Sequence, residues 1–261
     1  MKKLGLALGA GGGRGIVHIG FIKALEEENI KIDIIAGSSM GSIVGACYAM
    51  GMSADEMWQE IKNLKKNEVV DFSINPIFSG AFMRSKKIFK KLSTYFGEKT
   101  FNDLKLPFYA VSVDLKSGKP YVSQGDDHLT TLVVASSSIP GVFKPVEYKD
   151  MLLCDGAVKY RVPCSVAKEM GADVVVGIDA LGPLKPIKKK RLNLISTVFR
   201  MFEVVDCDLT ERCYDIDKPN LFIVPDLGDT DQFDFKSFDY IYEQGYKCGK
   251  EYAPQIKELL K

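Results

Sequence analysis

The sequence has few of the features that mark membrane-spanning, secreted or nucleic-acid-binding proteins. It contains no run of 18 or more apolar residues, so we expect no membrane-spanning helix. Its 35 basic and 34 acidic residues give a net charge of +1, which excludes a general attraction to nucleic acid or anionic membranes. The apolar stretch at residues 4–8 leads into glycines and not into a signal-peptide cleavage site. We therefore expect a cytoplasmic protein without a nucleic-acid partner.

Residues that bind metals or form disulfides are also sparse. There are only two histidines, His18 and His128, and the six cysteines include no C-x-x-C pair. Without a secretory signal, we expect the cysteines to be reduced thiols that fill apolar space. No metal-ligand spacing is visible, so the sequence predicts neither a metal nor a cofactor.

The first half of the chain alternates between strand and helix patterns. Residues 4–8 and 33–37 are short apolar runs typical of buried strands, and a helical pattern covers residues 16–28. Residues 173–179 form another near-continuous apolar strand pattern. This alternation predicts an α/β fold with a mostly parallel sheet and helices on its faces. The length of 261 residues fits one domain over residues 1–261.

The segment Gly-Ser-Ser-Met-Gly at residues 37–41 carries the strongest chemical signal. It fits the G-x-S-x-G pattern, in which a serine sits on a tight turn between a strand and a helix. A predicted strand precedes it and a small, apolar, helix-compatible run follows it. Such a turn exposes the serine hydroxyl and places its amide at a helix N-terminus. Ser39 is therefore our candidate nucleophile.

A glycine-rich loop, Gly-Ala-Gly-Gly-Gly-Arg-Gly at residues 9–15, follows the first predicted strand. Its backbone amides can point into a site and bind an anion. The dinucleotide fingerprint G-x-G-x-x-G fails here, because Arg14 stands where the third glycine is required and no acidic residue ends the second strand. The loop thus fits an oxyanion site better than a nucleotide site.

The general base is the less obvious partner. In α/β-hydrolases the order along the chain is serine, then acid, then histidine. Here no histidine follows residue 128, and the strand-end acid Asp155 comes after both histidines. We therefore interpret His18 and His128 as structural. Asp155 ends a predicted strand before Gly156, a position that can face the crevice at the carboxyl ends of a sheet. Burial would raise its pKa and make it a base. A turn aspartate before glycine is the alternative.

Two further segments each allow two interpretations. Residues 53–100 are an irregular insertion, either a lid or lipid-facing element or an ordinary packed loop. Residues 185–191 carry four lysines and an arginine and precede an apolar helical pattern over residues 192–205. This second segment could dock on an anionic lipid surface, or it could be a solvated charge run before a packed helix.

Four motifs in order make the chain resemble the patatin-like phospholipase family. They lie at residues 11–15 with 18–20, at residues 37–41, at residues 135–143 with 145–146, and in Asp-Gly-Ala at residues 155–157. The matching blocks span residues 4–179, whereas residues 180–261 match no motif. The resemblance implies a three-layer α/β/α fold and a catalytic dyad of Ser39 as nucleophile and Asp155 as base. It also implies an oxyanion hole from the amides of Gly11, Gly12 and Gly13.

Two positions in the glycine loop complete the comparison with the family. Arg14 matches the family's basic residue, which would order the loop or meet a phosphate. Ala10 stands where some members have a further glycine, and its backbone amide is unaffected. The resemblance implies a lipid acyl-ester hydrolase of the phospholipase A or lysophospholipase type. A catalytically silent lipid- or acyl-binding protein and an acyltransferase are the alternatives. Peripheral contact with a membrane surface and the oligomeric state stay open.

Overall fold

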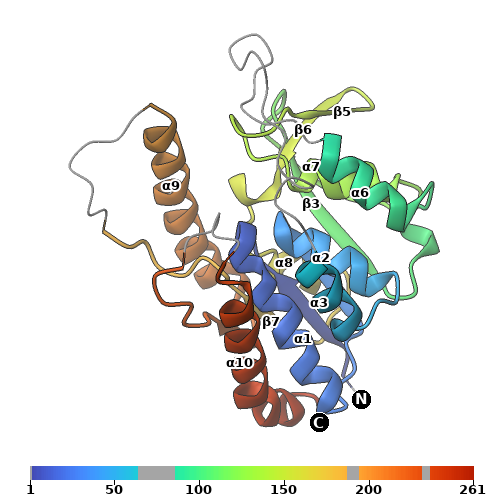
Figure 1. Cartoon of the computed structure of the whole chain (residues 1–261), viewed down its shortest axis with the longest axis vertical. Coiled ribbons are helices and arrows are strands. Elements are labelled where there is room, and N and C mark those ends of the chain that lie inside the picture. The colour runs from blue at the N-terminus through green and yellow to red at the C-terminus, as the bar shows by residue number, and fades with distance from the viewer. Residues whose placement is uncertain (1, 64–85, 187–193, 231–235) are drawn as a thin grey trace.

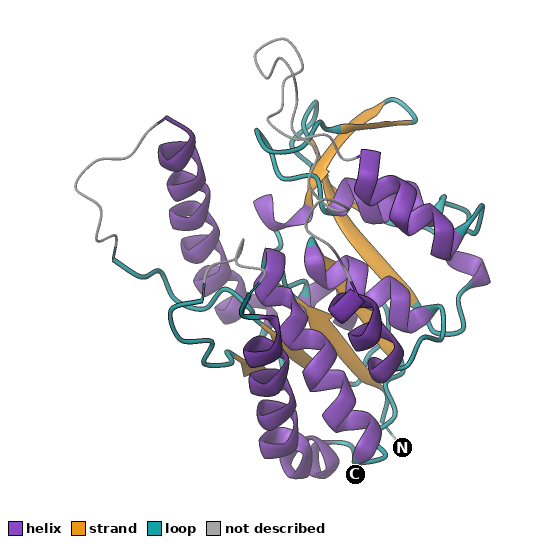
Figure 2. Cartoon of the chain, viewed as in Figure 1, coloured by secondary structure: helices purple, strands orange, loops and turns teal. Residues whose placement is uncertain are grey.

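A computed structural model describes residues 2–63, 86–186, 194–230 and 236–261. One twisted sheet runs through the molecule, with most helices stacked on one of its faces (Figures 1 and 2). Within the described ranges, no helix is long and apolar enough to cross a membrane.

The sheet is parallel in its centre and antiparallel at one edge. Its strand order is β5-β6-β3-β2-β1-β7-β8, and β4 pairs with β3 outside this path. The parallel strands are β1 (Leu4–Leu8), β2 (Ile34–Ser38), β3 (Phe108–Asp114), β7 (Val174–Ile178) and β8 (Leu221–Ile223). The antiparallel strands are β4 (Pro120–Val122), β5 (Val146–Tyr148) and β6 (Met151–Asp155). The expected α/β class is confirmed.

Helices cover the two faces unequally. The thicker layer contains α1 (Val17–Glu27), α2 (Met40–Ala49), α3 (Ala54–Asn63), α6 (Lys86–Phe96), α7 (Leu129–Ser136) and α10 (Phe238–Leu259). The short helix α8 (Cys164–Glu169) packs on the opposite face, and α9 (Leu194–Asp217) lies at one side of the molecule (Figure 1). Among the described residues, the 3-10 turns are η1 (Gly12–Ile16), η2 (Phe101–Asp103) and η3 (Gly156–Val158).

The strand side chains show why three layers form. In β1, Leu4, Leu6 and Leu8 enter the large core under α1 and α2, whereas Ala7 faces α8. Because successive side chains of a strand point to opposite faces, this alternation buries large residues on one side and small ones on the other. The small side chains let α8 approach closely. The expected three-layer arrangement is therefore confirmed.

The direction of β6 differs from our expectation. The sequence placed Asp155 at the end of a strand of a mostly parallel sheet, and β6 does end there, but β6 runs antiparallel to β3 and pairs Asp155 with Ser112. The neighbouring residue of β3, Val111, pairs with Ser38 on β2. Asp155 thus reaches the level of Ser38 because a reversed strand ends there.

The structure describes parts of the two segments for which the sequence allowed two interpretations, residues 53–100 and 185–205. The insertion at residues 53–100 contains α3 and α6, while residues 64–85 between them lie outside the described residues. The predicted helix at residues 192–205 is α9, which continues to Asp217. Residues 187–193, with most of the basic cluster, also lie outside the described residues.

The C-terminal part, which matched no motif, joins the same core. Strand β8 extends the sheet beside β7, and α10 packs lengthwise along α1. The two helices approach so closely that a Cβ on Gly245 would lie 2.1 Å from the Val17 carbonyl oxygen. Glycine at this position lets the helix backbones touch.

Candidate active site

Ser39 occupies a strained turn between β2 and α2. Its φ of 53° and ψ of −123° are unusual for a residue with a side chain, and only 5% of its surface is exposed. Such strain persists where surrounding contacts impose it, and it clusters at functional sites. The strand–turn–helix context predicted for residues 37–41 is thus present.

The end of α7 holds this turn in place. The Ser39 amide donates to the Ser136 carbonyl at 3.1 Å, and the Ser137 hydroxyl donates to the Ser39 carbonyl at 3.1 Å. The Ser42 hydroxyl donates to the same carbonyl at 2.7 Å. The serine run at residues 136–138, part of the third motif, therefore supports the turn. The sequence pattern alone gave no role to these serines.

A motif glycine allows the turn to sit against the glycine loop. A Cβ on Gly41 would lie 2.1 Å from the Leu8 carbonyl oxygen at the end of β1. No side chain fits in that space, so the N-terminus of α2 can press against the start of the loop. The pattern at residues 37–41 reflects this close approach.

Asp155 lies beside Ser39 across β3. A Cβ on Gly156 would approach the Val111 carbonyl oxygen to 2.3 Å and the Ser38 hydroxyl to 2.7 Å, which shows how tightly the two turns meet. Asp155 is 2% exposed, and its Oδ1 accepts from the Ala157 amide at 2.8 Å. Burial raises the pKa of Asp155 to about 7, while hydrogen bonding by Ser39 and Ala157 acts in the opposite direction.

The second carboxylate oxygen of Asp155 is the one left for a proton. Within the described part of the chain, Oδ2 has no hydrogen bond of normal geometry. The Ser39 hydroxyl is close enough to favour the ionised carboxylate, but the contact is looser than a well-formed hydrogen bond. Catalytic hydrogen bonds are often loose without substrate, so this geometry fits a nucleophile and its base.

The glycine loop supplies backbone amides at the same place. The first amide bonded within η1 is that of Arg14, which donates to the Gly11 carbonyl at 3.0 Å. The amides that precede it have no partner inside the turn, as at any helix N-terminus. Gly11 and Gly12 line one cavity with Ser39 and Asp155. Gly13 and the half-buried Arg14 are not among its lining residues.

The two histidines lie away from the cavity lining. His18 is fully buried, and its Nε2 donates to the Gly9 carbonyl at 2.8 Å. Burial lowers the pKa of His18 to about 4, so it is neutral at pH 7. His128 caps α7, where its Nδ1 accepts from the Thr131 amide at 3.2 Å. Both contacts are structural, as the sequence suggested.

The cavity, of about 290 Å³, has a polar end and apolar walls. Its polar end contains Ser39, Asp155 and the glycine loop, and its walls include Ile139, Val158 and Leu181. One side is formed by α9, which contributes Met201, Phe202, Glu203, Val205 and Asp206. Sequence reasoning missed this role of α9, because no motif lies beyond residue 179. The arrangement suits an ester with an apolar acyl chain.

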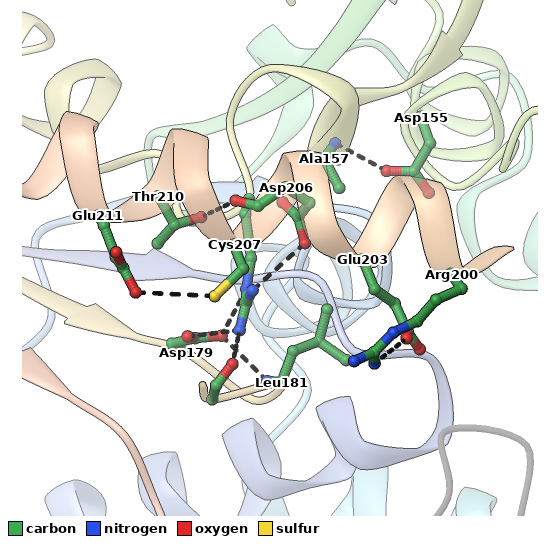
Figure 3. A network of polar contacts seen from close by, with 12 residues as sticks. Asp155, Ala157, Asp179, Leu181, Arg200, Glu203, Asp206, Cys207, Thr210 and Glu211 are labelled. Carbon is green, nitrogen blue, oxygen red and sulfur yellow. Dashed lines mark hydrogen bonds and ion pairs between the residues drawn. The ribbon is translucent and has the colours of Figure 1, made fainter. Parts of the chain in front are cut away.

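Asp206 belongs to a buried charge network under α9 (Figure 3). Arg161 binds Asp179 through two hydrogen bonds of 2.9 and 2.7 Å, and its Nη1 lies 3.4 Å from Asp206 Oδ2. Burial, together with the charges of Asp179 and Asp155, raises the pKa of Asp206 to about 7, while Arg161 opposes the rise. The cavity thus contains a second carboxyl group whose pKa is raised to about 7.

Two curated relatives match nearly the whole chain. The chain is 28% identical to Lysophospholipase nte1 of Emericella nidulans over 285 residues, which cover 98% of this chain and 18% of the relative. It is 31% identical to Patatin-like phospholipase domain-containing protein 6 of Mus musculus, over 95% of this chain and 20% of the relative. The chain thus spans about a fifth of the length of these relatives.

Solved structures share the fold at low sequence identity. The crystal structure of VipD from Legionella pneumophila matches 99% of this chain and 67% of its own, with a TM-score of 0.61 and 12% identity. The type III effector protein ExoU matches 100% of this chain and 54% of its own, with a TM-score of 0.53 and 14% identity.

The family model covers the segments that form the polar end of the cavity. The family model described as Patatin-like phospholipase matches residues 6–168. This match includes the glycine loop, the Ser39 turn, the end of α7 and Asp155. The chain belongs to the patatin-like phospholipase family.

Proposed function

We propose that this chain hydrolyses acyl esters of lipids, with Ser39 as nucleophile and Asp155 as general base. The observation that carries the proposal is one cavity in which Ser39, Asp155 and two loop glycines meet apolar walls. The raised pKa of Asp155 supports the role of a base that works near neutral pH. The relatives named as lysophospholipase and phospholipase domain support lipids as the substrate class.

The reaction would proceed in two halves. Ser39 Oγ attacks the ester carbonyl carbon while ionised Asp155 takes the hydroxyl proton. The tetrahedral intermediate collapses, the C–O bond to the alcohol breaks, and Asp155 returns the proton to the leaving oxygen. Water then attacks the acyl-enzyme with Asp155 again as base, which releases the fatty acid and restores Ser39.

The oxyanion would be held by amides of the loop at Gly11, Gly12 and Gly13. Their position before the first bonded amide of η1 leaves them available, and each such donor contributes about 3 kcal/mol to the transition state. The Ala10 amide is excluded, because it donates to the Arg161 carbonyl at 2.9 Å. We assign Arg14 the role of ordering this loop or meeting a substrate phosphate.

We also propose a single domain over residues 1–261 that touches membranes peripherally. Strand β8 and helix α10 complete the sheet and core begun by residues 4–179, which supports one domain. Met201 and Val205 on α9 are 63% and 54% exposed and also line the cavity. An apolar surface that continues into the cavity supports entry of lipid from that side.

Hydrolysis of a monoacyl phospholipid tests the proposed function. Purified protein should release fatty acid, and Ser39→Ala should lower the rate by at least about a thousandfold without loss of fold. A matched variant at another serine, exposed Ser117→Ala, should retain the activity. Transfer of the acyl group to an added alcohol without release of fatty acid would favour an acyltransferase. Bound lipid without turnover would favour a silent lipid-binding protein.

A further inference from the structure

Arg161 connects three parts of the candidate active site. Its carbonyl accepts from the Ala10 amide at the start of the glycine loop, and its guanidinium binds Asp179 at the end of β7. The same guanidinium reaches Asp206 on α9 and donates to the Gly182 carbonyl. Arg161 also lies six residues after Asp155. The residue therefore ties the glycine loop and the Asp155 turn to α9.

The contact with Asp206 is the weaker of the two ion pairs. Asp179 takes the guanidinium in a two-bond geometry, which is the stronger arrangement for arginine and carboxylate. Asp206 receives a single contact of 3.4 Å, and its Oδ1 is buried without a partner among the described residues. One cation thus serves two carboxylates. Loss of the charge on Asp206 would leave the Arg161–Asp179 pair intact.

Helix α9 also contacts the rest of the molecule through Arg200, which donates to the Lys185 carbonyl at 2.7 Å, and through Tyr214, whose ring centroid lies 5.3 Å from that of Phe222 on β8. Among the described elements, its main contact is with η3, the turn that follows Asp155. Its cavity-facing residues Met201, Phe202 and Val205 form one wall of the site. Because Asp206 itself lines the cavity, its ion pair with Arg161 acts directly on this wall.

We propose that the Arg161–Asp206 ion pair fastens α9 over the catalytic cavity and thereby sets how tightly long acyl chains bind. The inference rests on the proposed hydrolase function and deepens it. Both side chains act as positioning residues, since neither is assigned a contact with the reacting ester. A fastened α9 presents Met201, Phe202 and Val205 to the acyl chain, whereas a released α9 withdraws that apolar contact.

Protonation of Asp206 would release the helix. The charged groups that face Asp206 are Arg161, Asp179 from the end of β7, and Asp155 from the end of β6, with Cys207 beside it on α9. Burial is the main cause that raises the pKa of Asp206 to about 7, the two neighbouring carboxylates add to the rise, and Arg161 opposes it. As pH falls through 7, the ion pair is lost and α9 loosens.

The test compares p-nitrophenyl octanoate with p-nitrophenyl acetate. Asp206→Asn imitates the protonated carboxyl group, so the ratio of KM for octanoate to KM for acetate should rise about fivefold or more at pH 8. The control is Glu211→Gln, which removes one exposed charge from the same helix outside the cavity lining. This control should leave the ratio unchanged, and Asp206→Glu should restore it in part.

The pH dependence of the octanoate-to-acetate KM ratio separates the proposed role of Asp206 from a merely structural one, which would not change this ratio with pH. In the wild type, the octanoate-to-acetate KM ratio should rise as pH falls from 8 to 6, whereas in Asp206→Asn it should be flat. An unchanged ratio in Asp206→Asn, or equal losses on both esters, would overturn the proposal. Hydrogen exchange of α9 amides in the wild type, corrected for intrinsic rate, needs no variant. Protection must be lower at pH 6 than at pH 8.

The failure of this inference can be told apart from failure of the proposed function. If Ser39→Ala still hydrolyses both esters, the nucleophile assignment is wrong whatever the KM ratios show. If Ser39→Ala is inactive and Asp206→Asn keeps the wild-type ratio, only the role of the ion pair is wrong.

Discussion

At the scale of single residues, the candidate site contains a carboxyl group, that of Asp155, whose buried position disfavours its ionised form. Asp155 is buried without a neighbouring cation among the described residues, so its ionised form is poorly stabilised. The resulting pKa of about 7 suits proton transfer from Ser39 but costs stability when the group is charged. In the proposed mechanism, this charge acts on Ser39, and the glycine loop lies at the same end of the cavity.

The first prediction concerns activity against pH. Because Asp155 must be ionised to accept the Ser39 proton, kcat/KM for p-nitrophenyl acetate should fall about tenfold per pH unit below about pH 7. Stopped-flow or initial-rate measurements from pH 5 to pH 9 give the profile. The acetyl ester is chosen because it depends least on α9. Full activity retained at pH 5 would rule out a base with the pKa of Asp155.

The second prediction concerns stability against pH. The folded-state pKa of Asp155 is raised from its ordinary 3.8 to about 7, so the folded state binds more protons between these values and stability falls as pH rises through them. At about 1.4 kcal/mol per pH unit, the penalty reaches about 4 kcal/mol above pH 7. Asp155→Asn should therefore be more stable than the wild type at pH 8 and nearly equal to it at pH 4.

Urea unfolding of both proteins at pH 4 and pH 8 checks this sign. The control is Asp126→Asn, an aspartate next to α7 and outside the cavity lining. This variant should show no comparable gain at pH 8. A wild type that is more stable than Asp155→Asn at pH 8 would contradict the buried, poorly stabilised carboxylate.

At the scale of helices and strands, close backbone contacts explain why Gly41 and Gly245 are glycines, better than a need for flexibility does. Gly41 lets α2 pack against the end of β1, and Gly245 lets α10 pack against α1. Both contacts bring the backbone of one element against a carbonyl oxygen of another. The motif at residues 37–41 carries one of these contacts, whereas the glycines of α10 belong to no motif.

The third prediction concerns the α1–α10 contact. A Cβ on Gly245 would overlap the Val17 carbonyl oxygen at 2.1 Å, so Gly245→Ala should force the helices apart and destabilise the protein by about 2 kcal/mol or more. Gly97→Ala is the control, since no atom lies within 4 Å of its Cβ position. Its positive φ of 58° should cost only about 1 kcal/mol. Equal losses in the two variants would show that α10 does not pack as described.

The elements also show what sequence patterns can and cannot predict. The strand, turn and helix around Ser39 were predictable because each signal lies within about 15 residues. The direction of β6 was not predictable, because its short run of four apolar residues has the same pattern in a parallel and in an antiparallel strand. The Ser39–Asp155 proximity was expected from the strand end at Asp155 and from the family resemblance, neither of which gives the direction of the strand.

At the scale of the whole molecule, the site is assembled from segments far apart in the chain. The motifs at residues 11–157 contribute Ser39, Asp155 and the glycine loop, and α9 then closes one side of the cavity. The ion pair that attaches α9 was not predicted from the sequence. Arg161 and Asp206 are 45 residues apart, and no spacing rule links an arginine on a loop to an aspartate on a helix. Charge pairs of this kind become visible only in the folded chain.

We propose above all that Ser39 is the nucleophile of a lipid hydrolase. The most direct test is reaction with a fluorophosphonate followed by mass spectrometry of the digested protein. We predict one adduct, on the peptide that contains Ser39, and none in Ser39→Ala. Asp155→Asn should react far more slowly although it remains folded. Folded wild-type protein that stays unlabelled, or an adduct at another residue that survives in Ser39→Ala, would contradict the claim.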